Sequence, residues 1–288
     1  MMITVVTTLY KGKKYLDSLL SNIQQNALRL KKSHTEVDVE YIIVNDYPTE
    51  KIRINDEIRA FEVIVIENEN NCGIHESRAK AVNRARGEFI QFLDQDDHLA
   101  DNALLSQFEN IGSADVSVAN GYESYNGELT AFYKNLRVQK LALKKIFYYY
   151  VGNQIVSPGQ CMIRKESIPQ AWLSNFMRVN CSDDYLLWLI MMEANKEFVL
   201  NPTPLFYHEI TGENISGKFE TKFKSNLEMC EITKNTGSLS DKSLKRIKSF
   251  TTAKCLWKKT DNKLEKANLI LKSTDVFFWN AVYKIMTF

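Results

Sequence analysis

Three aspartates in one short turn are the residues best suited to chemistry. Asp94, Asp96 and Asp97 directly follow the apolar run 89–93. Carboxylates this close repel one another unless a cation lies among them. Mg²⁺ or Mn²⁺ is commonly held by one or two carboxylates together with substrate phosphates. An isolated turn of this kind is more often a solvated loop, but the apolar run before it and the motifs below favour a divalent metal site.

A second acidic motif, the pair Asp183 and Asp184, lies at the start of a predicted helix over 182–194. Ser182 is a suitable cap, and first-turn carboxylates favour a helix, so plain capping is the ordinary interpretation. A single carboxylate can also take a proton from a hydroxyl as a general base. The neighbouring charge raises its pKa towards neutrality, whereas the helix N-terminus lowers it. With the acidic turn upstream, we favour catalysis by one of these two aspartates.

Strand and helix signals alternate over the first hundred residues. Apolar and β-branched runs predict strands at 3–7, 39–44, 61–66 and 89–93, and helical spacing predicts helices at 16–27 and 77–86. This alternation indicates parallel strands joined by right-handed crossovers. Ligands bind such sheets beyond the carboxyl ends of the strands. Asp46, the segment 71–78 and Asp94 all fall at or after predicted strand ends, so we expect one binding site there.

The later chain gives weaker signals. Short strands are predicted at 114–120, 160–163 and 198–200, and Trp188 is placed in the core. The apolar, tyrosine-rich stretch 141–151 is left unassigned between strand and helix. From residue 218 the pattern is helical and rich in lysine.

Composition sets the class of protein. The chain has 288 residues, 44% of them hydrophobic and 25% charged, which is close to an average soluble domain. A net charge of +2 does not indicate nucleic-acid binding. Five scattered cysteines without a C-x-x-C pair argue against a zinc site or a disulfide framework. Neither a signal peptide nor a spanning helix is predicted, and the triplet Asn214-Ile215-Ser216 has little weight as a glycosylation signal.

Four segments in order resemble the family 2 inverting glycosyltransferases of the GT-A fold. They are Thr7-Thr8-Leu9-Tyr10, Ile42-Ile43-Val44-Asn45-Asp46, Asn71-Cys72-Gly73-Ile74 with Ser77-Arg78, and Phe92-Leu93-Asp94-Gln95-Asp96-Asp97. The resemblance covers about the first 100 residues and continues more weakly to residue 216. It implies an α/β fold of the GT-A, Rossmann-like kind, with a mixed central sheet flanked by helices and a helical C-terminal extension.

The resemblance also implies roles. Residues on the donor side would be Thr8, Tyr10, Asp46, Asn71, Gly73, Arg78 and Asp94, with Asp96 and Asp94 as metal ligands. Asp46 would read the base, typically uracil, and Arg78 would lie near the base and diphosphate. Asp184 matches the catalytic aspartate, and Asp183 stands where the family usually has glutamate. The chain departs from the family at Asn45, which replaces an acidic residue, so base selectivity is not fixed by the pattern.

Histidines add one open question. Some GT-A enzymes use a late histidine as a metal ligand. His208 aligns loosely with that histidine; it lies in the segment Leu205-Phe206-Tyr207-His208-Glu209, with Ser216 after it. A structural or surface histidine is the favoured interpretation, and the metal ligand is the alternative. His75, beside Gly73, is expected to shape the nucleotide loop.

The function implied by the resemblance is transfer of a sugar, with inversion, from a nucleotide-diphosphate sugar to an acceptor hydroxyl. A UDP-sugar donor, Mn²⁺ or Mg²⁺ as cofactor, and a saccharide or lipid-linked saccharide acceptor are expected. Bacterial polysaccharide or glycolipid assembly in the cytoplasm is the implied setting. Two alternatives stay open: a non-catalytic sugar-binding or scaffold protein, and a metal-dependent nucleotidyltransferase. The second would need a glycine-rich phosphate loop, and no such motif occurs.

We expect a catalytic domain over 1–217, with a nucleotide-binding half at 1–100 and an acceptor-side half at 101–217. A basic, mainly helical extension follows at 218–288. Basic amphipathic helices beside aromatic residues can lie on an anionic membrane surface. Packing of these helices on the catalytic domain or a second subunit is slightly favoured over peripheral contact with the inner membrane face. Nucleic acid is not expected as a partner, and the oligomeric state is not predicted.

Overall fold

The computed structural model describes residues 1–55, 59–210 and 219–288. Within these ranges nine strands form one mixed sheet in the order β3-β2-β1-β4-β8-β6-β9-β5, and β7 pairs with β6. The strands are β1 Met2–Leu9, β2 Asp38–Asn45, β3 Glu62–Glu67, β4 Phe89–Phe92, β5 His98–Leu99, β6 Val116–Tyr125, β7 Glu128–Ala131, β8 Cys161–Arg164 and β9 Phe198–Glu209. The mixed sheet expected from the sequence is thus present.

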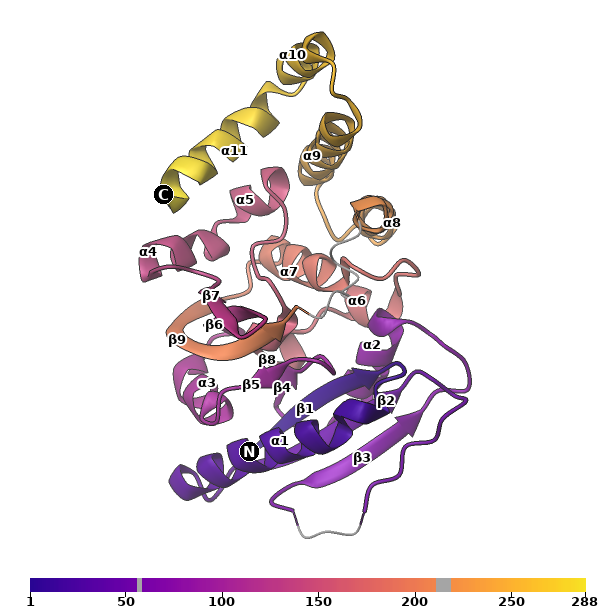
Figure 1. The fold of residues 1–288 in the computed structure, drawn as a ribbon, viewed down its shortest axis with the longest axis vertical. Helices are drawn as coiled ribbons and strands as arrows, with labels where there is room; N and C mark the ends of the chain where they lie inside the picture. Colours follow the sequence, from indigo (N-terminus) through magenta and orange to yellow (C-terminus); the bar gives the residue numbers. More distant parts are fainter. Residues whose placement is uncertain (56–58, 211–218) are drawn as a thin grey trace.

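Helices cover both faces of this sheet, and the C-terminal helices α9 to α11 lie farther out (Figure 1). The α-helices of the described residues are α1 Leu16–Ser33, α2 Ile74–Arg84, α3 Ala103–Ile111, α4 Leu136–Gln139, α5 Lys145–Tyr150, α6 Gln170–Ser174, α7 Asp183–Glu193, α8 Phe219–Asn235, α9 Asp241–Lys259, α10 Lys263–Lys272 and α11 Thr274–Thr287. Alternate residues of β1 serve opposite cores. Ile3 and Val5 pack with α1 and α3, whereas Val6 packs with α2 and α7. This period of two is what a strand buried on both faces requires.

The first four strands bring the predicted site together. β1 runs parallel to β2 and to β4, so their carboxyl ends meet at one edge of the sheet. Leu9 pairs with Asn45 at the ends of β1 and β2, and β4 ends at Phe92. Tyr10, Asp46 and Asp94 therefore leave neighbouring strands at the same edge, as the sequence predicted.

Several boundaries differ from the sequence prediction. The helix expected at 77–86 begins earlier, at Ile74, and ends at Arg84, before Gly87. The unassigned stretch 141–151 is mostly helical, with α5 at its centre. The strand expected at 198–200 continues to Glu209, because it pairs along the whole of β6. His208 therefore lies inside β9 rather than after a strand.

The C-terminal helices pack on the rest of the chain. α9 contacts α8 and α5, and α11 contacts α5 (Figure 1). The expected boundary after residue 217 and the triplet at Asn214 lie outside the described residues, as does Ser216. Among the described helices, none combines the length and apolar character needed to cross a membrane.

A buried glutamate holds the N-terminal half of the sheet together. Glu40 of β2 accepts hydrogen bonds from the Thr4 hydroxyl (2.6 Å), from the Arg86 backbone N–H (2.6 Å) and from Arg86 Nε (2.8 Å). Its side chain is fully buried, whereas Glu62, the other carboxylate partner of Arg86, is 58% exposed. These contacts fasten β1, β2 and the turn after α2 to one another.

We predict that Glu40→Ala lowers the free energy of unfolding by about 3 kcal/mol, because it leaves the buried Thr4 hydroxyl and the Arg86 backbone N–H without their acceptor. The matched variant Glu62→Ala removes an exposed partner of the same arginine and should change stability by less than about 1 kcal/mol. Urea unfolding of the two variants measures the difference. Equal effects would show that the Glu40 network does not hold this half together.

Candidate donor and base site

A buried arginine lies at the centre of the site. Arg78 of α2 is 5% exposed; its Nη1 donates to Asp183 Oδ2 (2.6 Å) and its Nη2 donates to Asp94 Oδ1. Its guanidinium carbon lies 5.5 Å from the centre of the Phe92 ring. Burial disfavours the charge, but Asp94 and then Asp183 hold the arginine pKa above its ordinary value. We call Arg78, Asp94 and Asp183 the arginine bridge, since it joins the two acidic motifs predicted from the sequence.

The loop before α2 is held by Asp46. Its carboxylate accepts from the backbone N–H of Cys72 (2.7 Å) and Gly73 (2.9 Å) and from Asn68 Nδ2 (2.8 Å). The Asn71 side chain also accepts from the Gly73 N–H, at 3.0 Å. In this structure Asp46 thus anchors the loop that the resemblance assigns to the nucleotide, and it does so as a buried residue.

Gly73 needs to be glycine on two counts. Its φ is +84°, a value that side chains disfavour, and an added Cβ would lie 3.0 Å from Asn180 Oδ1. That same oxygen accepts from the backbone N–H of Ile74, at 3.2 Å, in the first turn of α2. Asn180 was not identified from the sequence, and no local pattern marks it.

Aromatic side chains line the outer edge of the site. Tyr10 is 46% exposed and meets Tyr47 edge to face, with ring centres 5.5 Å apart. Lys11 Nζ lies 5.5 Å from the centre of each ring. The Tyr10 backbone N–H donates to Gln95 Oε1 (3.0 Å), which links this edge to the acidic turn. Thr8, near the end of β1, is partly exposed at the same edge.

The surroundings of Asp184 suit a general base. Its Oδ2 accepts from Asn153 Nδ2 (2.8 Å), its Oδ1 accepts from the Tyr185 backbone N–H (2.7 Å), and the residue is partly exposed. Burial of the carboxyl, followed by repulsion from Asp183, raises the pKa of Asp184 to about 7. Asn153 stands in a stretch where the sequence showed no motif.

The segment before α7 is strained and is held from outside. Cys181 has a φ of +144°, which is rare for a residue with a side chain. Ser182 is the N-cap residue, but the expected side-chain cap is wrong, because its hydroxyl donates to Asn226 of α8 at 2.8 Å. Because the Ser182 hydroxyl is bonded to α8, it does not cap the backbone N–H groups at the start of α7.

α8 also fastens the segment ahead of Ser182. Glu228 accepts from the backbone N–H groups of Arg178 (2.7 Å) and Val179 (2.8 Å). The Ser225 hydroxyl donates to the Val179 carbonyl at 2.8 Å. The first helix after residue 218 therefore supports the segment that carries Asp183 and Asp184.

His75 stays inside the wall of the site. Its Nδ1 accepts from the Met177 backbone N–H (3.0 Å), so Nε2 carries the proton and donates to the Trp172 carbonyl (3.0 Å). Burial lowers the pKa of His75, which keeps the ring neutral. Trp172 and Trp188 are both fully buried, so neither stacks on a sugar, and Trp188 is a core residue as expected.

His208 is paired with the third aspartate of the acidic turn. Its Nδ1 lies 3.0 Å from Asp97 Oδ1, which also accepts from the Glu209 backbone N–H at 2.9 Å. The hydrogen bond that His208 donates to the Asp97 carboxylate raises the pKa of His208 to about 9. Metal-binding histidines are usually oriented by such a carboxylate on the other ring nitrogen. Asp97 is buried, whereas Asp96 is partly exposed, and burial raises the Asp96 pKa.

The donor groups suit a metal that is shared with a substrate. Among residues 1–55, 59–210 and 219–288, no three His, Cys, Asp or Glu side chains are grouped closely enough to hold a metal by themselves. Asp94 already contacts Arg78, and Asp96 keeps an accessible carboxylate. Mg²⁺ and Mn²⁺ are typically bound by one or two carboxylates with substrate phosphates completing the shell. The residues therefore fit a divalent cation that arrives with a diphosphate.

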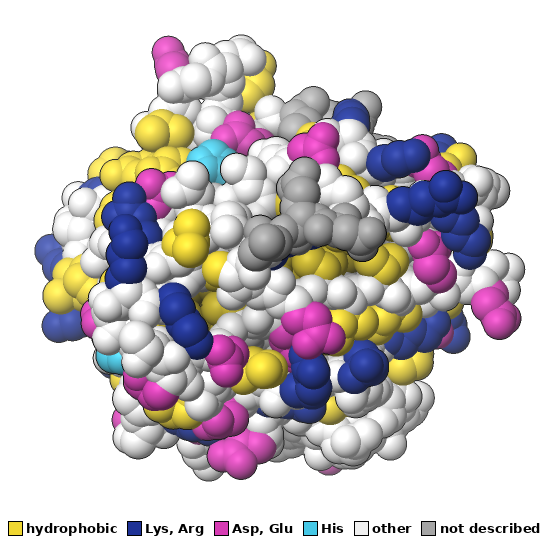
Figure 2. All heavy atoms as spheres, turned by 90° about the horizontal axis from the view of Figure 1, so that it is seen from below, with side chains coloured by type: hydrophobic (Ala, Val, Ile, Leu, Met, Phe, Trp, Pro, Cys, Tyr) yellow, Lys and Arg dark blue, Asp and Glu magenta, His cyan; other side chains and the backbone are white. Residues whose placement is uncertain are grey.

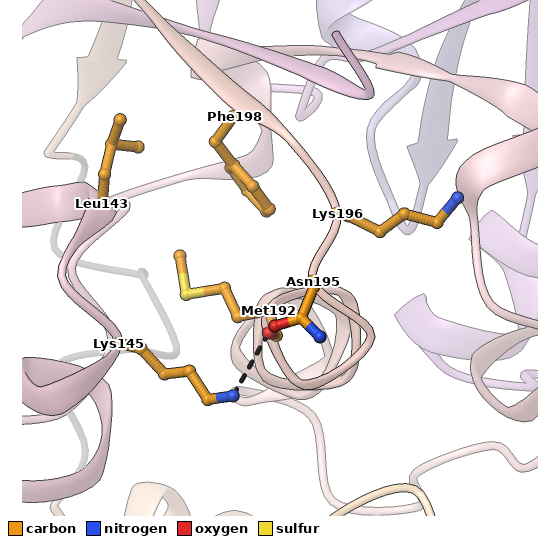
Figure 3. Close-up of a pocket in the computed structure, with 6 residues that line it drawn as sticks. All are labelled: Leu143, Lys145, Met192, Asn195, Lys196 and Phe198. Atoms are coloured by element: carbon orange, nitrogen blue, oxygen red, sulfur yellow. Dashed lines mark hydrogen bonds between the residues drawn. The ribbon is translucent and has the colours of Figure 1, made fainter.

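Two other surface features do not offer a comparable site. A hollow of about 310 Å³ lies at the C-terminal end of α7, whereas Asp184 lies at its N-terminal end. Figure 3 shows the residues that line this hollow. Its two lysines are neutralised, Lys145 by Glu193 (3.1 Å) and Lys196 by Asp115 (3.3 Å). The face seen in Figure 2 mixes basic, acidic and hydrophobic side chains. It is not the one-signed basic surface that nucleic-acid backbones require.

Comparison with known proteins defines the class. The sequence model of Glycosyl transferase family 2 matches residues 4–172, and the chain belongs to this family. It is therefore a glycosyltransferase, and the non-catalytic alternative falls away. An uncharacterized glycosyltransferase of Methanocaldococcus jannaschii is 24% identical over 285 residues, which cover 97% of this chain and 84% of that relative.

Two further proteins help to place it. The putative teichuronic acid biosynthesis glycosyltransferase TuaG of Bacillus subtilis is 31% identical over 113 residues, 38% of this chain and 41% of TuaG. S. aureus TarS 1–349, solved in complex with UDP-GlcNAc, has the same fold, with a TM-score of 0.62 and 18% identity. The match covers 87% of this chain and 71% of that chain. The GT-A fold expected from the sequence is thus confirmed.

The Asp97–His208 contact makes a titration prediction. In the metal-free protein His208 should titrate near pH 9, and Asp97→Asn should lower that pKa by more than about one unit, because the stabilising carboxylate charge is gone. NMR of the imidazole protons follows each histidine separately. Buried His75 serves as the internal reference and should stay neutral in both proteins. A wild-type His208 that titrates near pH 6.5 would rule out the ion pair.

Proposed function

We propose that this glycosyltransferase moves a sugar with inversion from a UDP-sugar to an acceptor hydroxyl. The observation that carries the proposal is the arginine bridge, because it sets the acidic turn against the helix that bears Asp184. Asp94 of the acidic turn and Asp183, the neighbour of Asp184, contact the two terminal nitrogens of one guanidinium. The groups proposed to bind the leaving diphosphate and the proposed base are thus held close to one reaction centre.

On the donor side, we assign the exposed Tyr10 ring and Thr8 to the nucleoside. The loop at Asn71 and Gly73 is the next wall of the pocket, held in place by Asp46. Base reading by Asp46 stays a prediction, since its oxygens already accept three hydrogen bonds. We therefore assign selectivity for uracil to the shape of the pocket at Tyr10 as well as to Asp46.

Asp94 and Asp96 would hold a divalent cation, Mn²⁺ or Mg²⁺, with the donor diphosphate. When bound, the cation supplies Lewis-acid stabilisation of the charge that develops on the leaving diphosphate. Arg78 adds fixed positive charge on the protein side of the same group. His208, oriented by Asp97, is a further candidate ligand through its Nε2.

Asp184 is the proposed base. It takes the proton of the acceptor hydroxyl while that oxygen bonds to the anomeric carbon and the bond from this carbon to the diphosphate oxygen breaks. Nucleoside diphosphate leaves, and the configuration at the carbon inverts. A pKa of about 7 suits a base that works near neutrality. Asn153 orients the carboxylate, and Asp183 stays paired with Arg78.

The acceptor is proposed from the names of relatives. TuaG is named for teichuronic acid biosynthesis, and TarS was solved with UDP-GlcNAc. These names support a UDP-sugar donor, a saccharide or lipid-linked saccharide acceptor, and a place in polysaccharide assembly for this chain. We assign the choice of sugar to residues between β6 and α7.

We predict that Asp184→Asn lowers the release of UDP from a UDP-sugar at least about 1,000-fold, since no other group takes the proton. In the wild type, kcat/KM should fall as the pH drops below about 7, because the base becomes protonated. Asn153→Ala removes a hydrogen bond to the ionised form, so the fall should begin at higher pH. Initial rates of UDP release, measured across pH with Mn²⁺ present, test the predictions for the wild type and for both variants.

Asn153→Asp is the matched control, since it keeps the shape but adds a like charge, and it should shift the profile further in the same direction. A structural role for Asn153 would lower the rate equally at every pH. Normal turnover by Asp184→Asn would remove Asp184 from the mechanism.

A further inference from the structure

The outer face of α11 carries an apolar stripe. Phe278, Ala281 and Ile285 recur at helical spacing on the side away from the protein, and Phe278 and Ile285 are 59% and 73% exposed. The inner side of the same helix packs on α5, where the Tyr283 ring meets the Phe147 ring at 5.0 Å. α11 is thus apolar on both sides, although only one side contacts the fold.

α10 repeats this arrangement. Leu264 and Leu271, seven residues apart, share one helix face with Ala267 and are 81% and 75% exposed. Leu269, on the opposite side, is buried. Single exposed leucines are ordinary, but two consecutive helices that each leave an apolar stripe exposed indicate an unfilled contact surface. We call the stripes of α10 and α11 the outer stripe.

Lysines surround the outer stripe. Between residues 256 and 288 the chain has six lysines and three acidic residues. Lys263 and Lys272 flank the α10 stripe, and Lys284 is exposed beside the α11 stripe. Within the described ranges, none of these three lysines takes part in an ion pair. The surface therefore combines apolar side chains with uncompensated positive charge.

The combination of apolar side chains with positive charge distinguishes two possible partners, a second copy of the chain and a lipid surface. A second copy of the chain would place lysines against lysines around the same apolar contact, which is unfavourable. An anionic lipid surface satisfies both parts, because acyl chains take the apolar side chains and headgroups attract the lysines. We propose that α10 and α11 form a docking surface for an anionic lipid bilayer, lying in its interface without spanning it.

The placement of these helices agrees with such a contact. In Figure 1 the arrowhead of β1 ends near α2, and α10 lies well beyond it, on the far side of α8 and α9. Lipid contact at α10 and α11 therefore leaves the carboxyl end of β1 open to a soluble donor. The proposal is independent of the transfer chemistry, since none of its residues belongs to the site.

The test is flotation of the full chain with vesicles of phosphatidylcholine, with and without roughly 30% phosphatidylglycerol. The wild type should float with the anionic vesicles only, and the double variant Leu271→Glu, Ile285→Glu should bind at least about tenfold more weakly. Leu129→Glu, at a 52% exposed leucine of β7, is the matched control and should bind as the wild type does. Failure of the wild type to float, or equal flotation of the double variant, would overturn the proposal.

A second arm covers misfolding of the double variant. Replacing Lys263, Lys272 and Lys284 by alanine should weaken flotation roughly fivefold for each lysine, and added salt should weaken the wild type. Flotation insensitive to both would overturn the proposal. So would a wild type that light scattering shows as a dimer without lipid affinity, because the outer stripe would then bind a second copy. UDP binding should be the same in all these variants, which separates this result from the test of the site.

Discussion

A buried guanidinium between two carboxylates is the constraint on which this site depends. Arg78 is 5% exposed and contacts both Asp94 and Asp183. Removing one member of such a group leaves an unpaired buried charge, which typically costs about 3–5 kcal/mol. α2, the turn after β4 and the start of α7 must therefore meet in one geometry. The acidic turn and the proposed base keep a fixed separation for the same reason.

The supports of this bridge come from distant parts of the chain. Asp46 and Asn180 fix the loop ahead of α2 from opposite sides, one from the end of β2 and the other from the segment before α7. Glu228 of α8 holds that segment in turn. α8 thus supports Asp184 indirectly, because Glu228 holds the segment that leads into α7. α8 is therefore part of the support of the site, whereas α10 and α11 present a separate surface.

The sequence predicted the parts of the site that have local patterns. Asp94, Asp96 and Asp184 follow a buried strand or begin a helix, and strand alternation placed the first two at one sheet edge. Asn153, Asn180 and Glu228 have no such pattern, because their roles exist only once the chain has folded. The Ser182 cap was wrong for the same reason, since Asn226 competes for its hydroxyl. β9 was predicted too short because its length is set by pairing with β6.

Calorimetric titration with UDP, with and without Mn²⁺, separates the roles of the two acidic motifs that Arg78 joins. We propose that the acidic turn binds the donor and that α7 supplies the base. UDP should then bind only with the metal, Asp96→Ala should abolish binding, and Asp184→Asn should leave binding unchanged. Metal-independent binding, or equal loss in both variants, would contradict this division of roles.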